Sequence, residues 1–112
     1  MEKKLLLIGG AGGIGRAIAT RAVAEGWTVT VMDLKASLVA HPVADGIISI
    51  SIDLQDEDSI VKAFRGVGEL HGFVNLAGFM MGVKPLEDTS IEEFDNVMGC
   101  NIRGAYLASL QA

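Results

Sequence analysis

The groups in this chain that are best placed to bind a ligand are backbone amides, and they lie in the stretch GGAGGIG, Gly9 to Gly15. Five of these seven residues are glycine, the residue that loses the most conformational entropy on folding. A glycine-rich turn between a strand and a helix lets backbone N–H groups approach a pyrophosphate without obstruction by side chains. The helix that follows points its positive dipole end and its unpaired N–H groups at the same place. The stretch therefore predicts a dinucleotide site.

An acidic residue extends this prediction. Asp33 follows the second apolar run, near the spacing of roughly 20 residues at which a carboxylate binds the ribose of a dinucleotide. A carboxylate accepts hydrogen bonds from both ribose hydroxyls but repels a 2′-phosphate, so Asp33 favours NAD over NADP. Lys35, close by, carries the opposite charge. The alternative is structural, because such glycines also serve tight turns and close helix packing, and an aspartate after a strand is common in loops.

Side chains that bind metals are scarce and scattered. His41, His71 and Cys100 stand apart, and no cysteine or histidine lies at ligand spacing, so no metal site is expected. The acidic residues of LEDTSIEEFD are typical of a helix start and a solvated face. A single cysteine cannot form an internal disulfide, and this favours a reducing compartment.

The elements that must position these residues follow from the alternation of short apolar runs with helical patterns, which is typical of β-α-β units and a parallel sheet. The expected strands are Lys4–Ile8, Thr28–Met32, Ile47–Ile52 and Gly72–Ala77.

Four helices are expected between and after these strands. The first begins near Gly13 and ends before Gly26, which suits a left-handed cap, and a short second helix ends before Pro42. Asp56 is a plausible N-cap for the third helix. Ser90 and Glu93 form a capping box at the start of the last helix. The apolar residues expected along one face of that helix are Ile91, Phe94, Val97, Met98, Ile102 and Ala105.

The whole chain limits the possible classes of protein. Its 112 residues, half of them hydrophobic, predict one globular domain spanning residues 1–112. The net charge is −5 and no basic cluster is present, so the sequence does not indicate nucleic-acid binding. No stretch approaches the ~18 to 20 apolar residues of a membrane span, and the apolar run before the glycines is too short for a secretion signal. A soluble cytoplasmic protein without a membrane partner is the expectation.

Together these residues resemble the short-chain dehydrogenase/reductase family over essentially the whole chain. Gly9, Gly13 and Gly15 are similar to the family's glycine pattern, and GGIG, which is Gly12, Gly13, Ile14 and Gly15, is common there. Two other registers, Gly10/Gly12/Gly15 and Gly9/Gly12/Gly15, also fit the glycines; the second resembles a longer, sugar-nucleotide-modifying branch. The motifs further along the chain favour the shorter branch.

Two of those motifs follow the third and fourth expected strands. Asp53-Leu54 resembles the family's adenine-contacting pair. Asn75-Leu76-Ala77-Gly78 is similar to its Asn-Asn-Ala-Gly motif, with Leu76 in place of the second asparagine. The resemblance therefore implies cofactor contacts at Asp53, Leu54, Asn75, Ala77 and Gly78.

The resemblance also implies the fold and the chemistry. The fold is a Rossmann-like three-layer α/β/α arrangement, a truncated doubly wound fold with four parallel strands in the order 3-2-1-4 and helices on both faces. The function is the NAD-binding portion of an alcohol or carbonyl oxidoreductase that transfers hydride. Asn101 falls where the family carries an active-site asparagine, and Ile8 stands where it usually has a threonine.

The family's catalytic serine and Tyr-x-x-x-Lys pair have no counterpart here. The only tyrosine, Tyr106, is followed four residues later by Leu110, and no lysine follows Lys84. The resemblance thus implies weak dinucleotide binding without catalysis. Asn101 is then expected to be idle, a helix residue whose side chain bonds to neighbouring backbone.

The alternative is an inactive structural or self-associating module. A homo-oligomer is expected in either case, because the strand Gly72–Ala77 would be an outer strand without charge or proline. The helix face near Val97, Cys100 and Leu107 would also be left partly bare.

Overall fold

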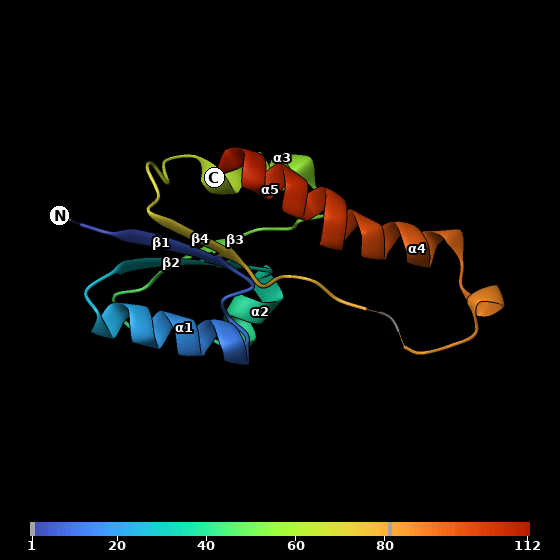
Figure 1. Ribbon diagram of the computed structural model, residues 1–112, viewed down its shortest axis with the longest axis horizontal. Helices are drawn as coiled ribbons and strands as arrows, with labels where there is room; N and C mark the ends of the chain where they lie inside the picture. Colours follow the sequence, from blue (N-terminus) through green and yellow to red (C-terminus); the bar gives the residue numbers. More distant parts are fainter. Residues whose placement is uncertain (1, 81) are drawn as a thin grey trace.

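The computed structural model, which describes residues 2–80 and 82–112, contains a four-stranded parallel sheet with helices on both faces (Figure 1). The strands are β1 (Lys4–Ile8), β2 (Thr28–Asp33), β3 (Ile48–Ser51) and β4 (Gly72–Asn75). Their order is β3-β2-β1-β4, and all three pairings are parallel. The predicted topology is confirmed, although β3 and β4 are each shorter than the sequence predicts.

The helices divide between the two faces of the sheet. Figure 1 shows α1 (Gly13–Ala24) and α2 (Lys35–Ala40) on one face, and α3 (Glu57–Phe64) and α5 (Ala105–Gln111) on the other. A short 3₁₀ helix, η1 (Leu86–Asp88), precedes α4 (Ile91–Met98). A π-helical segment, η2 (Gly99–Gly104), joins α4 to α5. Among the described residues no helix is both long enough and apolar enough to cross a membrane.

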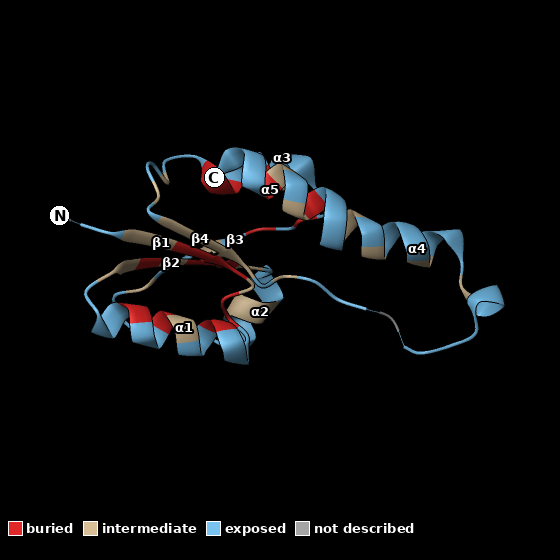
Figure 2. Cartoon of the chain, in the orientation of Figure 1, coloured by how far each residue is buried: buried red, intermediate tan, exposed pale blue. Residues whose placement is uncertain are grey.

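The alternation of side chains along the strands creates two cores. Leu6, Ile8 and Met32 point to the face covered by α3 and α5, whereas Leu7 and Val31 point to the face covered by α1. Figure 2 shows the buried residues concentrated in β1 and β2, the two central strands. Because Leu6 and Leu7 are fully buried, each contributes roughly 1.5–3 kcal/mol of hydrophobic stabilisation.

The helix ends agree with most of the sequence signals. Gly26 has a φ of +88° just after α1, and a carboxylate oxygen of Asp56 accepts hydrogen bonds from the Asp58 and Ser59 amides at the start of α3. The capping box at α4 is half formed. Ser90 Oγ accepts from the Glu93 amide at 3.0 Å, but the Glu93 carboxylate binds Lys84 Nζ at 2.6 Å instead of the Ser90 amide. The lysine therefore lowers the pKa of Glu93.

The predicted burial of the last helix is wrong. Most of the large residues expected to line its buried face are exposed: Ile91, Phe94, Met98 and Ile102. The core contacts come instead from Cys100, Leu107 and Ala108, two of which were expected to be bare. The reason is close packing at Gly104, where a Cβ would overlap the Leu54 carbonyl oxygen. Because small residues fit against Leu54, the larger apolar side chains are turned outward.

Candidate functional site

The C-terminal ends of the strands open into a cleft of about 450 Å³. This is the edge at which open α/β sheets bind ligands. The cleft collects residues that are far apart in the sequence, and the predicted site residues among those lining it are Gly9, Gly12, Asp33, Asp53, Leu54, Ala77 and Gly78. Three further predicted residues, Gly13, Asn75 and Asn101, are next to lining residues in the chain, whereas Ile14 and Gly15 lie beyond them in the first turn of α1 and do not line the cleft.

Two glycines of the stretch Gly9 to Gly15 are required by the fold itself. Gly9 has a φ of +78°, and a Cβ there would lie 2.8 Å from the Ala77 amide nitrogen. A Cβ on Gly15 would lie 2.8 Å from the carbonyl carbon of Gly10. These positions bring the turn close to the segment after β4 and allow α1 to pack against the turn.

Gly12 and Gly13 have no such structural requirement. A Cβ on Gly12 would come no closer than 3.7 Å to a neighbouring atom, and one on Gly13 would meet nothing within 4 Å. Neither residue has a positive φ. Both are exposed at the start of α1, where no side chain caps the helix and no acidic residue occupies the first turn. The Gly12 N–H donates a long hydrogen bond, 3.4 Å, to the Gly9 carbonyl. The N–H groups in the first turn of a helix have no intrahelical partner and are suited to an anion that approaches closely.

Asp33 joins the end of β2 to this turn. Its Oδ2 accepts a hydrogen bond from the Ala11 amide at 3.1 Å, and its Oδ1 accepts one from the Leu34 amide at 2.8 Å. An ionised carboxylate has about four acceptor positions, so each oxygen retains one for a ligand hydroxyl. Asp33 thus both holds the turn and presents a charge to the cleft.

Ile8, at the position of the family's threonine, is buried in the core below the turn. Backbone hydrogen bonds hold the strand ends at this point. The Gly9 amide donates to the Met32 carbonyl, and the Leu76 amide donates to the Ile8 carbonyl, both at 2.8 Å. The alignment of the β1 and β4 ends therefore does not depend on a side-chain hydroxyl.

Asp53 and Leu54 form the cleft wall beyond β3. The Asp53 amide donates to Ser59 Oγ at 2.9 Å, and Asp53 Oδ1 accepts from the Gln55 amide at 3.0 Å. Leu54 is buried in the core beneath. Asp53 is exposed, so its remaining acceptor positions face solvent and cleft.

The two asparagines position the segment that follows β4. Asn75 Oδ1 accepts from the Ala77 amide at 2.9 Å, which closes a local turn. Asn101 bonds twice to the backbone of Phe79: Oδ1 accepts from its N–H at 2.9 Å and Nδ2 donates to its carbonyl at 2.7 Å. Asn101 bonds to backbone as expected, but its partner is 22 residues away in the chain and not a neighbour. Gly78 leaves room for this contact, since a Cβ there would lie 3.0 Å from Asn101 Oδ1.

Several cleft residues were not among the predicted site residues: Ser37, His41, Gln55, Phe79 and Cys100. They come from segments that follow the strands, and strand order is the one sequence signal that places such segments together. Burial and the negative charge of Asp53 raise the pKa of the Cys100 thiol, so it stays protonated and is a poor nucleophile. Among the described residues there is no group of three or more acidic, cysteine or histidine side chains placed to hold a metal ion.

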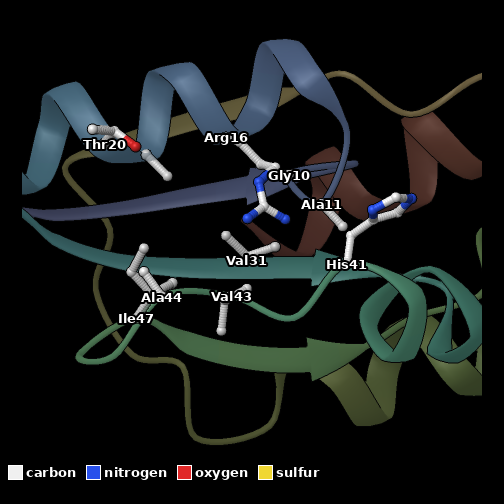
Figure 3. A pocket seen from close by; sticks show the side chains of 10 residues that line it. Gly10, Ala11, Arg16, Thr20, Val31, His41, Val43, Ala44 and Ile47 are labelled. Atoms are coloured by element: carbon white, nitrogen blue, oxygen red, sulfur yellow. The ribbon is translucent and has the colours of Figure 1, made fainter.

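A second cavity, of about 50 Å³, lies behind the glycine-rich turn (Figure 3). Arg16 of α1 and the segment 41–47 line it, and Ala11 and His41 line both this cavity and the cleft. The two cavities therefore adjoin at these two residues.

Comparisons with known proteins agree with this geometry. Residues 3–112 match the family profile described as short chain dehydrogenase. The chain is 32% identical to 2-(R)-hydroxypropyl-CoM dehydrogenase of Xanthobacter autotrophicus, covering 96% of this chain and 48% of that protein. It is 31% identical to levodione reductase of Leifsonia aquatica, over 95% of this chain and 44% of that protein.

Among solved structures, a similar one is 3-ketoacyl-(acyl-carrier-protein) reductase from Brucella melitensis complexed with NADH. Its TM-score is 0.86 at 28% identity, and the match covers 97% of this chain and 48% of that chain. The chain thus spans about half the length of the curated relatives it matches.

Proposed function

The chain belongs to the short-chain dehydrogenase family, and from this we propose that residues 1–112 form a dinucleotide-binding domain that takes NAD in the cleft at the ends of the strands. Proteins of this family bind a nicotinamide dinucleotide. The observation that carries the proposal is the bare backbone at Gly12 and Gly13. Neither packing nor φ explains glycine there, whereas close approach of a pyrophosphate does.

Each part of the cofactor has a proposed partner. The amides from Gly12 to Gly15, including that of Ile14, hold the pyrophosphate, and Asp33 accepts from the adenosine ribose. Asp53 and Leu54 contact the adenine. The segment Asn75–Gly78 forms the cleft floor toward the nicotinamide end. Bound NAD supplies the hydride acceptor for interconversion of an alcohol and a carbonyl.

We propose that this chain alone binds the cofactor without catalysis. The family's proton relay requires a Tyr-x-x-x-Lys pair, and Tyr106 is followed four residues later by Leu110. Where the sequence is part of a longer protein, the parent oxidises an alcohol or reduces a carbonyl with NAD. The single Cys100 is compatible with a reducing compartment such as the cytoplasm.

A calorimetric titration with NAD and with ADP tests the proposal. Because the adenosine and pyrophosphate contacts are present and those of the nicotinamide side are few, we expect dissociation constants of roughly 0.1 to several mM. ADP should bind nearly as well as NAD. A sub-micromolar NAD complex with far weaker ADP binding would contradict this division of contacts, and absence of saturable binding by both would refute the function.

A second candidate function, self-association, has its own supporting observation. Exposed apolar side chains follow one another along the helix from residue 91 to residue 111, which we call the apolar stripe: Ile91, Phe94, Met98, Ile102, Tyr106 and Leu110. Contiguous apolar patches on soluble proteins commonly mark interaction sites. We therefore propose that the chain forms a homo-oligomer, whether or not it holds a dinucleotide.

A further inference from the structure

The sheet has an open edge at β3, on the side opposite to β4. Among the described strands β3 pairs with β2 alone, and the pairing runs residue by residue without a bulge. Ile48, at the start of the strand, is 51% exposed. No charged residue and no proline lies between Gly46 and Asp53. Charges, prolines and bulges are the features that keep edge strands from pairing with another chain, so β3 is unprotected.

Two residues of β3 direct unpaired backbone groups to this edge. Alternate residues of a parallel strand turn their N–H and C=O groups to opposite sides. The Ile52 amide donates to the Asp33 carbonyl at 2.9 Å, on the side of β2, and so Ser49 and Ser51 turn their groups outward. In the described part of the chain no hydrogen bond is found for the backbone of either serine on that side.

The next outward residues along the chain limit any pairing to these two serines. The Ile47 amide donates to the Ala44 carbonyl at 3.2 Å. The Asp53 amide donates to Ser59 Oγ at 2.9 Å. Residues 47 and 53 therefore have no free N–H for another strand. A partner strand meets one free donor and acceptor pair on each side of Ile50, and this arrangement is complementary to itself.

We propose that two copies of this chain pair antiparallel through β3, about a two-fold axis at Ile50. Ser49 of one copy then lies opposite Ser51 of the second copy, and the two residues exchange both of their backbone hydrogen bonds. A shift of two residues in either direction would pair a serine with residue 47 or 53, whose amides are engaged. This contact adds to the proposed self-association, is separate from the apolar stripe, and does not depend on dinucleotide binding.

The side chains of β3 suit the same arrangement. Ile50 faces Ile50 of the second copy at a position where paired side chains approach most closely. On this face a groove of about 220 Å³ runs beside β3, and apolar side chains that line it are Ile48, Ile50, Val67 and Leu70. A second β3 strand closes the outer side of this groove and covers the exposed surface of Ile48. On the other face, serine hydroxyls lie opposite each other across the pair.

Cysteine crosslinking of the full chain tests this register. With Cys100→Ser in place, Ile50→Cys should form a disulfide-linked dimer under mild oxidation, because the axis brings the two residue-50 Cα atoms to about 4.5 Å. Ile48→Cys is the matched control. It is the more exposed position on the same face, yet its counterpart lies four residues further along the strand, about 13 Å away. Ile50→Cys should therefore crosslink more than about tenfold faster. Equal rates, or faster crosslinking of Ile48→Cys, would overturn the proposal.

A pair of charge variants tests the contact without a cysteine. Ser49→Lys with Ser51→Lys places like charges opposite each other across the axis, whereas Ser49→Lys with Ser51→Glu places opposite charges there. Both are made with Ile102→Lys, which puts a charge into the apolar stripe. Sedimentation should give a dimer dissociation constant about tenfold higher for the first variant than for the second. Equal association of the two would overturn pairing through β3, while the apolar stripe and NAD binding, which have their own tests, would stand.

Discussion

Asp33 has a structural role in the fold and a proposed role in cofactor binding. It ties the end of β2 to the glycine-rich turn through the Ala11 amide, and in the proposed function its remaining acceptor positions bind a ribose. A residue with both tasks affects binding directly, through its charge, and indirectly, through the turn it holds. The effect of replacing Asp33 is therefore judged from the ratio of the NAD and NADP affinities, because a disordered turn would weaken the binding of both nucleotides equally.

We expect Asp33→Ala to lower the affinity for NAD and to reduce the preference for NAD over NADP. The substitution removes the carboxylate that accepts hydrogen bonds from the ribose and repels the 2′-phosphate. The affinity for NAD should fall roughly tenfold, as expected when hydrogen bonds to a charged group are lost. Competitive titration of the two nucleotides provides the measurement, and Asp45→Ala, an exposed acid outside the cleft, is the control. An unchanged NADP to NAD ratio would remove Asp33 from the cofactor site.

At the scale of elements, the helical stretch from residue 91 to residue 111 makes one very close contact with the segment that follows β3. Gly104 packs so closely on Leu54 that a Cβ would stand 2.7 Å from the Leu54 Cβ. Leu54 follows Asp53 on the cleft wall, so the fit of this helix bears on the geometry of the site. Gly99, in the same stretch, has helical angles and open space around its missing Cβ.

These two glycines make a matched pair for a stability measurement. Gly104→Ala should lower the free energy of unfolding by roughly 1–3 kcal/mol, because the added methyl overpacks against Leu54. Gly99→Ala should raise it by up to about 1 kcal/mol, because alanine is the better helix former and meets no neighbour. Urea denaturation of both variants provides the measurement. A gain of stability in Gly104→Ala would mean that the helix lies further from the sheet than described.

The elements themselves were largely predictable from the sequence, because their signals are local. The apolar run at Lys4–Ile8, the cap at Gly26 and the N-cap at Asp56 each depend on a few consecutive residues. Strand order followed from the family resemblance, and it placed the ends of the strands at one cleft.

What could not be predicted depends on contacts between distant residues. The buried face of the last helix was misassigned because apolar residues occur on both sides of it, and only the fit of Gly104 against Leu54 decides between them. Asn101 bonds to Phe79, 22 residues away, and no spacing rule indicates that pair. The approach of His41 to Ala11 likewise arises from the path of the chain after α2.

The molecule as a whole is elongated, with extents of 53 × 25 × 21 Å. Its radius of gyration is 15.0 Å, whereas a compact chain of this length would have about 13 Å. Figure 1 shows why, because α4 and the short η1 helix before it lie beyond the end of the sheet. The outward residues of that helix form much of the apolar stripe. Among the described strands β4 pairs with β1 alone, which leaves its other edge open.

We therefore expect the sedimentation coefficient to rise with protein concentration as the chain associates. Ile102→Lys, at the centre of the apolar stripe, should shift the protein toward monomer, because a charge in an apolar interface is costly to bury. Val39→Lys, which adds the same charge to an exposed apolar position of α2, should not. A folded monomer that persists at high concentration would count against association through the stripe or the open β4 edge.

The central claim is that the bare backbone at the start of α1 receives the pyrophosphate of a dinucleotide. An ¹⁵N NMR titration of the unmodified chain and of Gly13→Ala with NAD tests it most directly. In the unmodified chain the largest shifts should occur at the amides from Gly12 to Gly15 and at Leu34, saturating at roughly 0.1 to several mM. Gly13→Ala should stay folded, because its Cβ meets no protein atom, yet bind NAD more than about tenfold more weakly, because that Cβ occupies the approach of the pyrophosphate. Equal affinity in the two proteins, or saturable shifts confined to residues outside the cleft, would contradict the claim.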